Sequence, residues 1–313
     1  MSIFNYVMGT IERYLYNEQI SQAKPNPRPV FILGHPRTGT TLLHSLIALD
    51  SSQFTYCSTF CAGFPSCFLW FEHYGKHLLK GVIGERRPMD NVKLHFDLPQ
   101  EDELATCVLS GGVSPYMPLY FMNQERQFRP FYAFDDNDNI SDSDSSSNSH
   151  EDDEKIDDPS TMGAARKKWI DSFMFLMRKL TIRDEHELQQ QQRQLKGQNH
   201  HRQQHPRQRR LALKSPVHTA RIRLLDKLFP DAQYIYIHRH PYDVLRSAIH
   251  MADTTYWYTY LSRPNDDQIL GFILRQYEIL YDRYIEGRNM LLLEQHQHQQ
   301  QNQNDNKRIV EIS

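Results

Sequence analysis

The stretch that decides the fold runs Val30-Phe-Ile-Leu33, Gly34-His-Pro-Arg-Thr-Gly39, Thr40-Thr-Leu-Leu-His-Ser-Leu-Ile-Ala-Leu49. The four apolar residues predict a short buried strand, and the glycines after them predict a tight loop. The Leu and Ile residues of the last part recur at helical spacing, which predicts a helix. Strand, glycine-containing loop and helix together are the opening unit of an α/β domain.

The same order of elements returns later in the chain. Gln233-Tyr-Ile-Tyr-Ile237 predicts a strand, and residues 242–251 predict the helix that follows its loop. Short strands are also predicted at 211–213 and 308–312. Helices are predicted at 1–24, 164–187 and 219–229, and two more after residue 251. This alternation favours an α/β fold of the P-loop-containing kind, with a mostly parallel sheet covered by helices on both faces.

Three polar tracts interrupt this pattern, at about 135–158, 189–210 and 295–306. They hold too little apolar surface to offset the entropy of ordering, so we expect disordered insertions. The first tract carries a net charge of −10, which leaves +8 on the rest of a chain whose net charge is −2. A mildly basic body suits an anionic ligand but falls short of the charge of a nucleic-acid binder.

The expected organisation is a helical lead-in at 1–27 and one α/β domain at 28–313. No apolar run approaches the roughly 20 residues that cross a bilayer. No secretory signal is evident at the N-terminus, which favours the cytoplasm. A Golgi location stays open if the N-terminus is incomplete.

The loop Gly34-x-x-x-x-Gly39-Thr40-Thr41 has the frame of a phosphate-binding loop with one departure. Nucleotide triphosphatases place Lys after the second Gly, and here that position is Thr40. What remains is a ring of backbone N–H groups at a helix N-terminus, two hydroxyls and Arg37, which can hold an oxyanion without a metal. A strand–helix turn with no ligand is the plain alternative.

A second polar segment follows the strand that ends at Ile237. Arg239 and Ser247 are eight residues apart, about two helical turns, so both can reach one anion. Ligands of open α/β sheets bind beyond this edge of the strands, and the Arg fork suits a phosphate. Taken alone, a surface Arg and a helix Ser without a ligand would explain the pair equally well.

Together these segments resemble the sulfotransferases that use 3′-phosphoadenosine 5′-phosphosulfate (PAPS), in their bacterial-type and tyrosylprotein-sulfotransferase-like branch. The resemblance rests on four motifs in order, outside the polar tracts, and on the Arg239/Ser247 spacing. The motifs are Pro36-Arg-Thr-Gly-Thr-Thr41, Arg87-Pro-Met-Asp-Asn91 before Pro99-Gln-Glu-Asp-Glu103, Leu213-Lys-Ser-Pro-Val-His218, and Phe229-Pro-Asp-Ala232.

The resemblance implies a role for each matching residue. It assigns the 3′-phosphate of PAPS to Arg239 and Ser247, and charge neutralisation at the transferring sulfuryl group to Lys214. The base that deprotonates the acceptor hydroxyl would be Glu101, Glu103 or His95. The 5′-phosphosulfate would be held by Arg37, Thr38, Gly39, Thr40 and Thr41.

Two departures bear on these expectations. His240 stands where the family has Asp, and the chain ends at Ser313 where the family continues into a C-terminal part that closes over the donor. We therefore expect either a fragment of a longer sulfotransferase or an incorrect gene model.

Two other functions stay open: a P-loop small-molecule kinase, and an inactive sulfotransferase-like binding protein. The acceptor is equally open among small molecules, lipid alcohols, carbohydrates and protein tyrosine. No metal and no nucleic-acid partner is expected.

Overall fold

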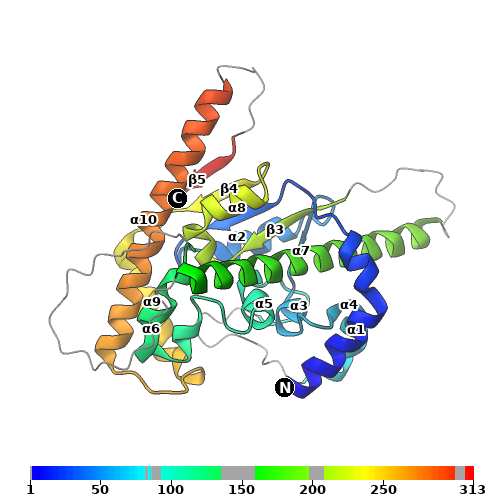
Figure 1. The fold of residues 1–313 in the computed structure, drawn as a ribbon, viewed down its shortest axis with the longest axis horizontal. Coiled ribbons are helices and arrows are strands. Elements are labelled where there is room, and N and C mark those ends of the chain that lie inside the picture. The colour runs from blue at the N-terminus through cyan, green and yellow to red at the C-terminus, as the bar shows by residue number, and fades with distance from the viewer. Residues whose placement is uncertain are drawn as a thin grey trace.

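A parallel sheet of five strands forms the centre of the computed structural model, in the order β2-β3-β1-β4-β5 (Figure 1). The structure describes residues 2–81, 84, 86, 93–134, 159–196, 208–299 and 307–313. The strands are β1 Val30–Leu33, β2 Phe54–Tyr56, β3 Arg210–Lys214, β4 Gln233–Ile237 and β5 Ile309–Ile312. The expected α/β class with a parallel sheet is confirmed.

The strand register brings three loops to one edge of the sheet. Ile32 of β1 lies opposite Lys214 of β3, and Leu33 lies opposite Tyr236 of β4. Because the strands are parallel, their carboxyl ends meet at the same edge. The loops after β1, β3 and β4 therefore lie next to one another.

Helices surround this sheet. The long α7 crosses the molecule, and α10 stands at the β5 end (Figure 1). The helices are α1 Ser2–Gln22, α2 Thr40–Ala48, α3 Thr59–Gly63, α4 Phe68–Leu78, α5 Asp102–Leu109, α6 Glu125–Phe128, α7 Pro159–Lys196, α8 Ile222–Leu228, α9 Pro241–Thr255 and α10 Asp266–Gln299. Short 3₁₀ turns are η1 Met117–Leu119, η2 Met122–Gln124, η3 Arg129–Phe131, η4 Pro216–Ala220 and η5 Tyr256–Tyr258. By the hydropathy criterion for membrane helices, none of these described helices could cross a bilayer.

The hydrophobic core is rich in aromatic rings. Trp169 and Phe173 of α7 stack with their ring centroids 4.8 Å apart, and Phe31 of β1 stacks on Tyr234 of β4 at 5.6 Å. All four side chains are almost fully buried. Aromatic pairs in such geometries contribute about 0.5–1.5 kcal/mol beyond the area they bury. The rings of Phe31 and Phe173 both meet the His218 ring edge-on, at 5.6 and 5.8 Å, which joins α7 to the sheet.

The prediction of disorder at 189–210 is wrong at both ends. Helix α7 continues to Lys196, and β3 begins at Arg210. Arg209 is buried against Asp184. Gln, Arg and Leu are good helix formers, so the low hydropathy of residues 189–196 is compatible with an exposed helix.

The expectations for the other tracts need similar revision. Helix α10 extends to Gln299, so the tract at 295–306 is helical at its start, and one long helix replaces two predicted ones after η5. The predicted helix at 219–229 divides into η4 and α8. The tract at 135–158 and the Arg87–Asn91 motif lie outside the described residues.

Candidate active site

The loop between β1 and α2 leaves a helix N-terminus uncapped. Gly39 is the N-cap residue of α2 at φ 102°, and no side chain caps the helix there. A Cβ on Gly39 would meet no atom within 4 Å, so space lies beside these N–H groups. Both observations fit a loop that holds an oxyanion.

Gly34 at the start of this loop has no room for a side chain. At its φ of 148°, a Cβ would lie 2.7 Å from the Thr38 hydroxyl oxygen and 3.2 Å from the Ile237 carbonyl oxygen. The Thr38 hydroxyl donates to the His35 carbonyl at 2.8 Å, which closes the turn. The loop therefore packs directly on the end of β4.

His35 occupies the inner side of the loop. Its ring lies 4.7 Å from the Tyr277 ring, centroid to centroid, and 5% of the residue is exposed. Burial lowers the pKa of His35 to about 4, against the opposing effect of its contact with the Pro36 carbonyl. His35 is therefore neutral near pH 7, and the positive charge inside the loop comes from Arg37.

Arg37 joins the loop to the second predicted segment. Its φ of 76° lies in the left-handed region, which is uncommon for a residue with a side chain. Its Nε donates to the Ser247 hydroxyl at 3.0 Å, and Arg239 Nη1 donates to the Arg37 carbonyl at 2.9 Å. The two predicted anion-binding segments thus come together at one place.

Lys214, at the end of β3, reaches both the loop and α5. Its ammonium Nζ lies 2.6 Å from Glu101 Oε1 and 3.3 Å from Thr41 Oγ1. The Tyr116 hydroxyl donates to the other oxygen, Glu101 Oε2, at 2.5 Å. Burial, followed by the charge of Glu101, raises the pKa of Tyr116 well above 10, so it stays a neutral donor. A carboxylate, an ammonium and a hydroxyl of the loop therefore form one chain of contacts.

Glu103 lies in the protein interior. Arg221 donates to both of its carboxylate oxygens, Ser114 to Oε1 at 2.7 Å and Trp169 to Oε2 at 3.1 Å. Glu103 and Arg221 are each 0% exposed. With its oxygens so occupied and no access to solvent, Glu103 cannot meet an acceptor in this arrangement.

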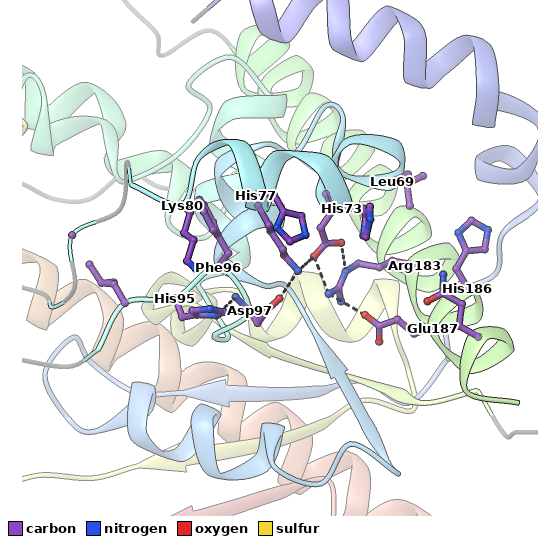
Figure 2. A pocket seen from close by; sticks show the side chains of 15 residues that line it. Leu69, His73, His77, Lys80, His95, Phe96, Asp97, Arg183, His186 and Glu187 are labelled. Atoms are coloured by element: carbon purple, nitrogen blue, oxygen red, sulfur yellow. Dashed lines mark hydrogen bonds and ion pairs between the residues drawn. The ribbon is translucent and has the colours of Figure 1, made fainter. Parts of the chain in front are cut away.

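His95 lies in a different place from Lys214 and Glu101. It contacts Asp97 at 3.1 Å, and its side chain is 68% exposed. Figure 2 shows both residues at a cavity of about 630 Å³, with His73 of α4 and Arg183 of α7 around it. The residues that line this cavity, among those described, include neither Lys214 nor any part of the loop 34–41.

Sequence reasoning missed Asp102 and His218. Both are fully buried, and Asp102 Oδ2 lies 2.5 Å from His218 Nε2. Burial acts to raise the pKa of Asp102, but the charge of His218 and the hydrogen bonds outweigh it, so the pKa is lowered. His218 belongs to the Leu213–His218 motif, which was the available signal. In the described ranges, no three His, Cys, Asp or Glu side chains are placed to hold a metal ion.

Comparison with known proteins identifies the class. Residues 120–301 match the model of a sulfotransferase family, which is more than half of the chain. The chain therefore belongs to the sulfotransferase family. Lys214, Arg239 and Ser247 lie inside the matched region, and the loop 34–41 precedes it.

Particular relatives come from mycobacteria. The chain is 26% identical over 294 residues to the omega-hydroxy-beta-dihydromenaquinone-9 sulfotransferases Stf3 of Mycobacterium bovis and of Mycobacterium tuberculosis. The match covers 93% of this chain and 62% of each relative, so the chain spans less than two thirds of their length.

Two solved structures show weaker likeness. The sulfotransferase STF1 of Mycobacterium tuberculosis gives a TM-score of 0.49 at 16% identity, over 97% of this chain and 66% of that chain. STF9 of Mycobacterium avium gives 0.46 at 16% identity, over 90% of this chain and 60% of that chain.

Proposed function

We propose that this protein transfers a sulfuryl group from PAPS to a hydroxyl acceptor, with Glu101 as general base. The observation that carries the proposal is the position of Lys214, whose ammonium contacts both Glu101 and Thr41 of the phosphate loop. The Lys214 ammonium thus links Glu101, which would accept the proton, to the loop that would hold PAPS.

The donor would bind along the edge formed by the loops after β1 and β4. The uncapped N-terminus of α2 has open space beside Gly39. Together with Thr38, Thr40 and Thr41 it would hold the 5′-phosphosulfate. Arg239 and Ser247 would hold the 3′-phosphate, with Arg37 between them and the loop. Bound there, PAPS would supply a sulfuryl group attached to a phosphate leaving group.

The protein's own part in the reaction is positioning and charge neutralisation. Lys214 would neutralise negative charge where the sulfuryl group leaves its phosphate oxygen. Glu101 would take the proton of the attacking hydroxyl, which commonly contributes about 10²–10⁴-fold in rate. Tyr116 would hold the Glu101 carboxylate in one orientation through its hydrogen bond.

Geometry distinguishes the three candidate bases. Glu103 is enclosed by Arg221, Trp169 and Ser114, and its role would be structural. His95 lies at the separate cavity of Figure 2 with Asp97. Glu101 alone of the three contacts Lys214, which supports it as the base.

The acceptor class rests on the relatives. The curated relatives are named for an omega-hydroxy menaquinone, which is a lipid alcohol. For this protein we propose only that the acceptor carries a hydroxyl group, which receives the sulfuryl group. We also propose that residues 28–313 form one catalytic domain after a lead-in at 1–27.

A transfer assay with labelled PAPS tests the function. The protein would be offered a phenol, a primary lipid alcohol, a sugar and a tyrosine peptide, each in the presence of EDTA. We expect label on one hydroxyl class with wild type and none with Lys214→Ala. A protein that binds adenosine 3′,5′-bisphosphate but labels no acceptor would be a sulfotransferase-like binding protein instead.

A further inference from the structure

Asp102 is a buried carboxylate that the proposed chemistry does not use. It is the first residue of α5, directly after Glu101, and is 0% exposed. Its Oδ1 accepts the backbone N–H of Lys214 at 3.1 Å and lies 3.4 Å from the Ser215 hydroxyl. A burial of this kind costs free energy unless the carboxylate is fully hydrogen-bonded. Asp102 therefore holds the carboxyl end of β3 against the start of α5.

His218 completes the second side of this carboxylate. Its Nε2 contacts Asp102 Oδ2, and its ring meets the Phe31 and Phe173 rings edge-on at 5.6 and 5.8 Å. Its Nδ1 is buried and has no hydrogen-bond partner within the described residues. Among the described residues, the ring makes its one polar contact with Asp102, so the aromatic walls and that carboxylate set its position.

The next residue ties the same segment to the phosphate loop. The Thr219 hydroxyl oxygen accepts the Gly34 N–H at 2.9 Å and lies 3.2 Å from the Gly34 carbonyl oxygen. The segment 214–219 thus contacts the proposed base Glu101 through Lys214 at one end. At its other end it contacts Gly34, the start of the phosphate loop, through Thr219. A shift of the segment would change the distance between Lys214 and both Glu101 and Thr41.

We propose that Asp102 and His218 are positioning residues for sulfuryl transfer, which hold the segment 214–219 so that Lys214 contacts Glu101 and Thr41 together. This proposal rests on the proposed function. Neither residue would touch donor or acceptor. Their effect would reach the reaction through the backbone of Lys214 and the hydroxyl of Thr219.

A matched control exists at the opposite end of β3. Asp184 of α7 is 1% exposed by its side chain, and it accepts from the backbone N–H of Arg209 at 3.3 Å and from the Arg209 guanidinium. Asp102 and Asp184 therefore each accept a backbone N–H group, one at either end of β3. Only Asp102 lies beside the proposed active site.

The experiment compares Asp102→Ala with Asp184→Ala in the full chain. Amide hydrogen exchange of Lys214 reports the position of the segment without any need for activity. In Asp102→Ala, we expect the exchange rate of the Lys214 amide, measured relative to that of Phe31, to rise at least about tenfold. In Asp184→Ala, this relative rate should stay as in wild type. Turnover of labelled PAPS per folded molecule should fall at least about tenfold in Asp102→Ala and less than about twofold in Asp184→Ala. The Kd for adenosine 3′,5′-bisphosphate, which lacks the sulfuryl group, should change less than about threefold in both.

A conservative variant keeps the test decisive if Asp102→Ala does not fold. Asp102→Asn keeps an oxygen for the Lys214 N–H and reverses only the hydrogen bond to His218. It should show normal Lys214 exchange and a loss of turnover that exceeds the loss in Asp184→Ala. The positioning role is overturned if Asp102→Ala matches Asp184→Ala in both Lys214 exchange and turnover, or, where only Asp102→Asn folds, if its turnover matches that of Asp184→Ala. If wild type neither binds the bisphosphate nor transfers label, the proposed function fails, while Lys214 exchange still decides whether Asp102 holds the segment.

Discussion

The ammonium of Lys214 lies 2.6 Å from a carboxylate oxygen of Glu101. The two residues are 113 positions apart, one at the end of β3 and one just before α5. The side chain of Lys214 is 3% exposed and that of Glu101 22% exposed, so the pair opens to solvent on the carboxylate side. A hydroxyl acceptor can approach Glu101 while Lys214 stays against the phosphate loop.

Glu101→Gln should lower turnover by at least about 10²-fold, because an amide cannot accept the acceptor's proton. Affinity for adenosine 3′,5′-bisphosphate should hardly change, since Glu101 would contact acceptor and not nucleotide. Steady-state kinetics and calorimetry separate the two effects. Tyr116→Phe serves as the companion variant, because it leaves the carboxylate and removes only its hydrogen bond. Full turnover in Glu101→Gln together with loss in His95→Ala would move the base to His95.

Glu103→Gln should act on stability instead. It leaves the Arg221 guanidinium without its buried counter-charge, which costs about 3–5 kcal/mol. The free energy of unfolding in denaturant should fall by that amount, while turnover per folded molecule stays near wild type. A loss of turnover of two orders of magnitude, with stability intact, would instead make Glu103 the base.

Arg239→Ala should weaken binding of the 3′-phosphorylated nucleotide selectively. Loss of a charge-assisted hydrogen bond costs about 1.5–3 kcal/mol. Binding of adenosine 5′-phosphosulfate, which has no 3′-phosphate, should change little. Arg223→Ala is the control, because this exposed Arg of α8 faces Glu286 rather than the loop. Equal losses for both nucleotides would refute the assignment of the 3′-phosphate site.

Acidification should destabilise the fold through His44 of α2. Burial, and then the charge of Lys214, lowers its pKa from the ordinary 6.5 to about 4. The His44 imidazole therefore binds a proton more readily in the unfolded chain than in the folded one. Its contribution to the free energy of unfolding is fully present above pH 6.5 and is lost as the pH falls towards 4. The loss amounts to about 3 kcal/mol for a shift of this size.

The variant His44→Gln isolates that contribution. A Gln amide can still donate to the Ala212 carbonyl, as His44 Nε2 does at 3.1 Å. Its free energy of unfolding should therefore decline less steeply between pH 6.5 and 4 than that of wild type. His35, whose pKa is also lowered to about 4, would account for part of the remaining decline. Identical pH profiles would show that His44 is not buried in its neutral form.

The strand, loop and helix around Gly34 and Gly39 could be predicted from the sequence because their signals are local. Gly34 and Gly39 lie between a strand and a helix, and their positive φ angles are of the kind that glycine favours. The sequence points to Arg239 and Ser247 for a similar reason, as polar residues just past a strand end, and their assignment to a phosphate stays a prediction. Their meeting with Arg37 required only the rule that parallel strands end at one edge.

The choice among Glu101, Glu103 and His95 could not be made from local patterns. Glu101 and Glu103 flank the start of one helix, and the residue that buries Glu103 is Arg221, 118 positions away. Asp102 lies in the first turn of α5, where the helix dipole alone is a sufficient reason for an acidic residue. Its contact with His218 depends on the packing of Phe31 and Phe173 around that ring.

The error at 189–210 has a different origin. Low hydropathy and repeated Gln were interpreted as disorder, but Gln is compatible with helix, and α7 was already anchored by Trp169 and Phe173. A helix that begins in the core can continue into solvent for several turns.

Calorimetric titration with adenosine 3′,5′-bisphosphate in EDTA tests the central claim most directly. We expect saturable binding to one site without a divalent cation, weakened selectively by Arg239→Ala and unaffected by excess ATP. Absence of binding, or binding of ATP that requires magnesium, would contradict the assignment of this loop and of Arg239 and Ser247 to PAPS.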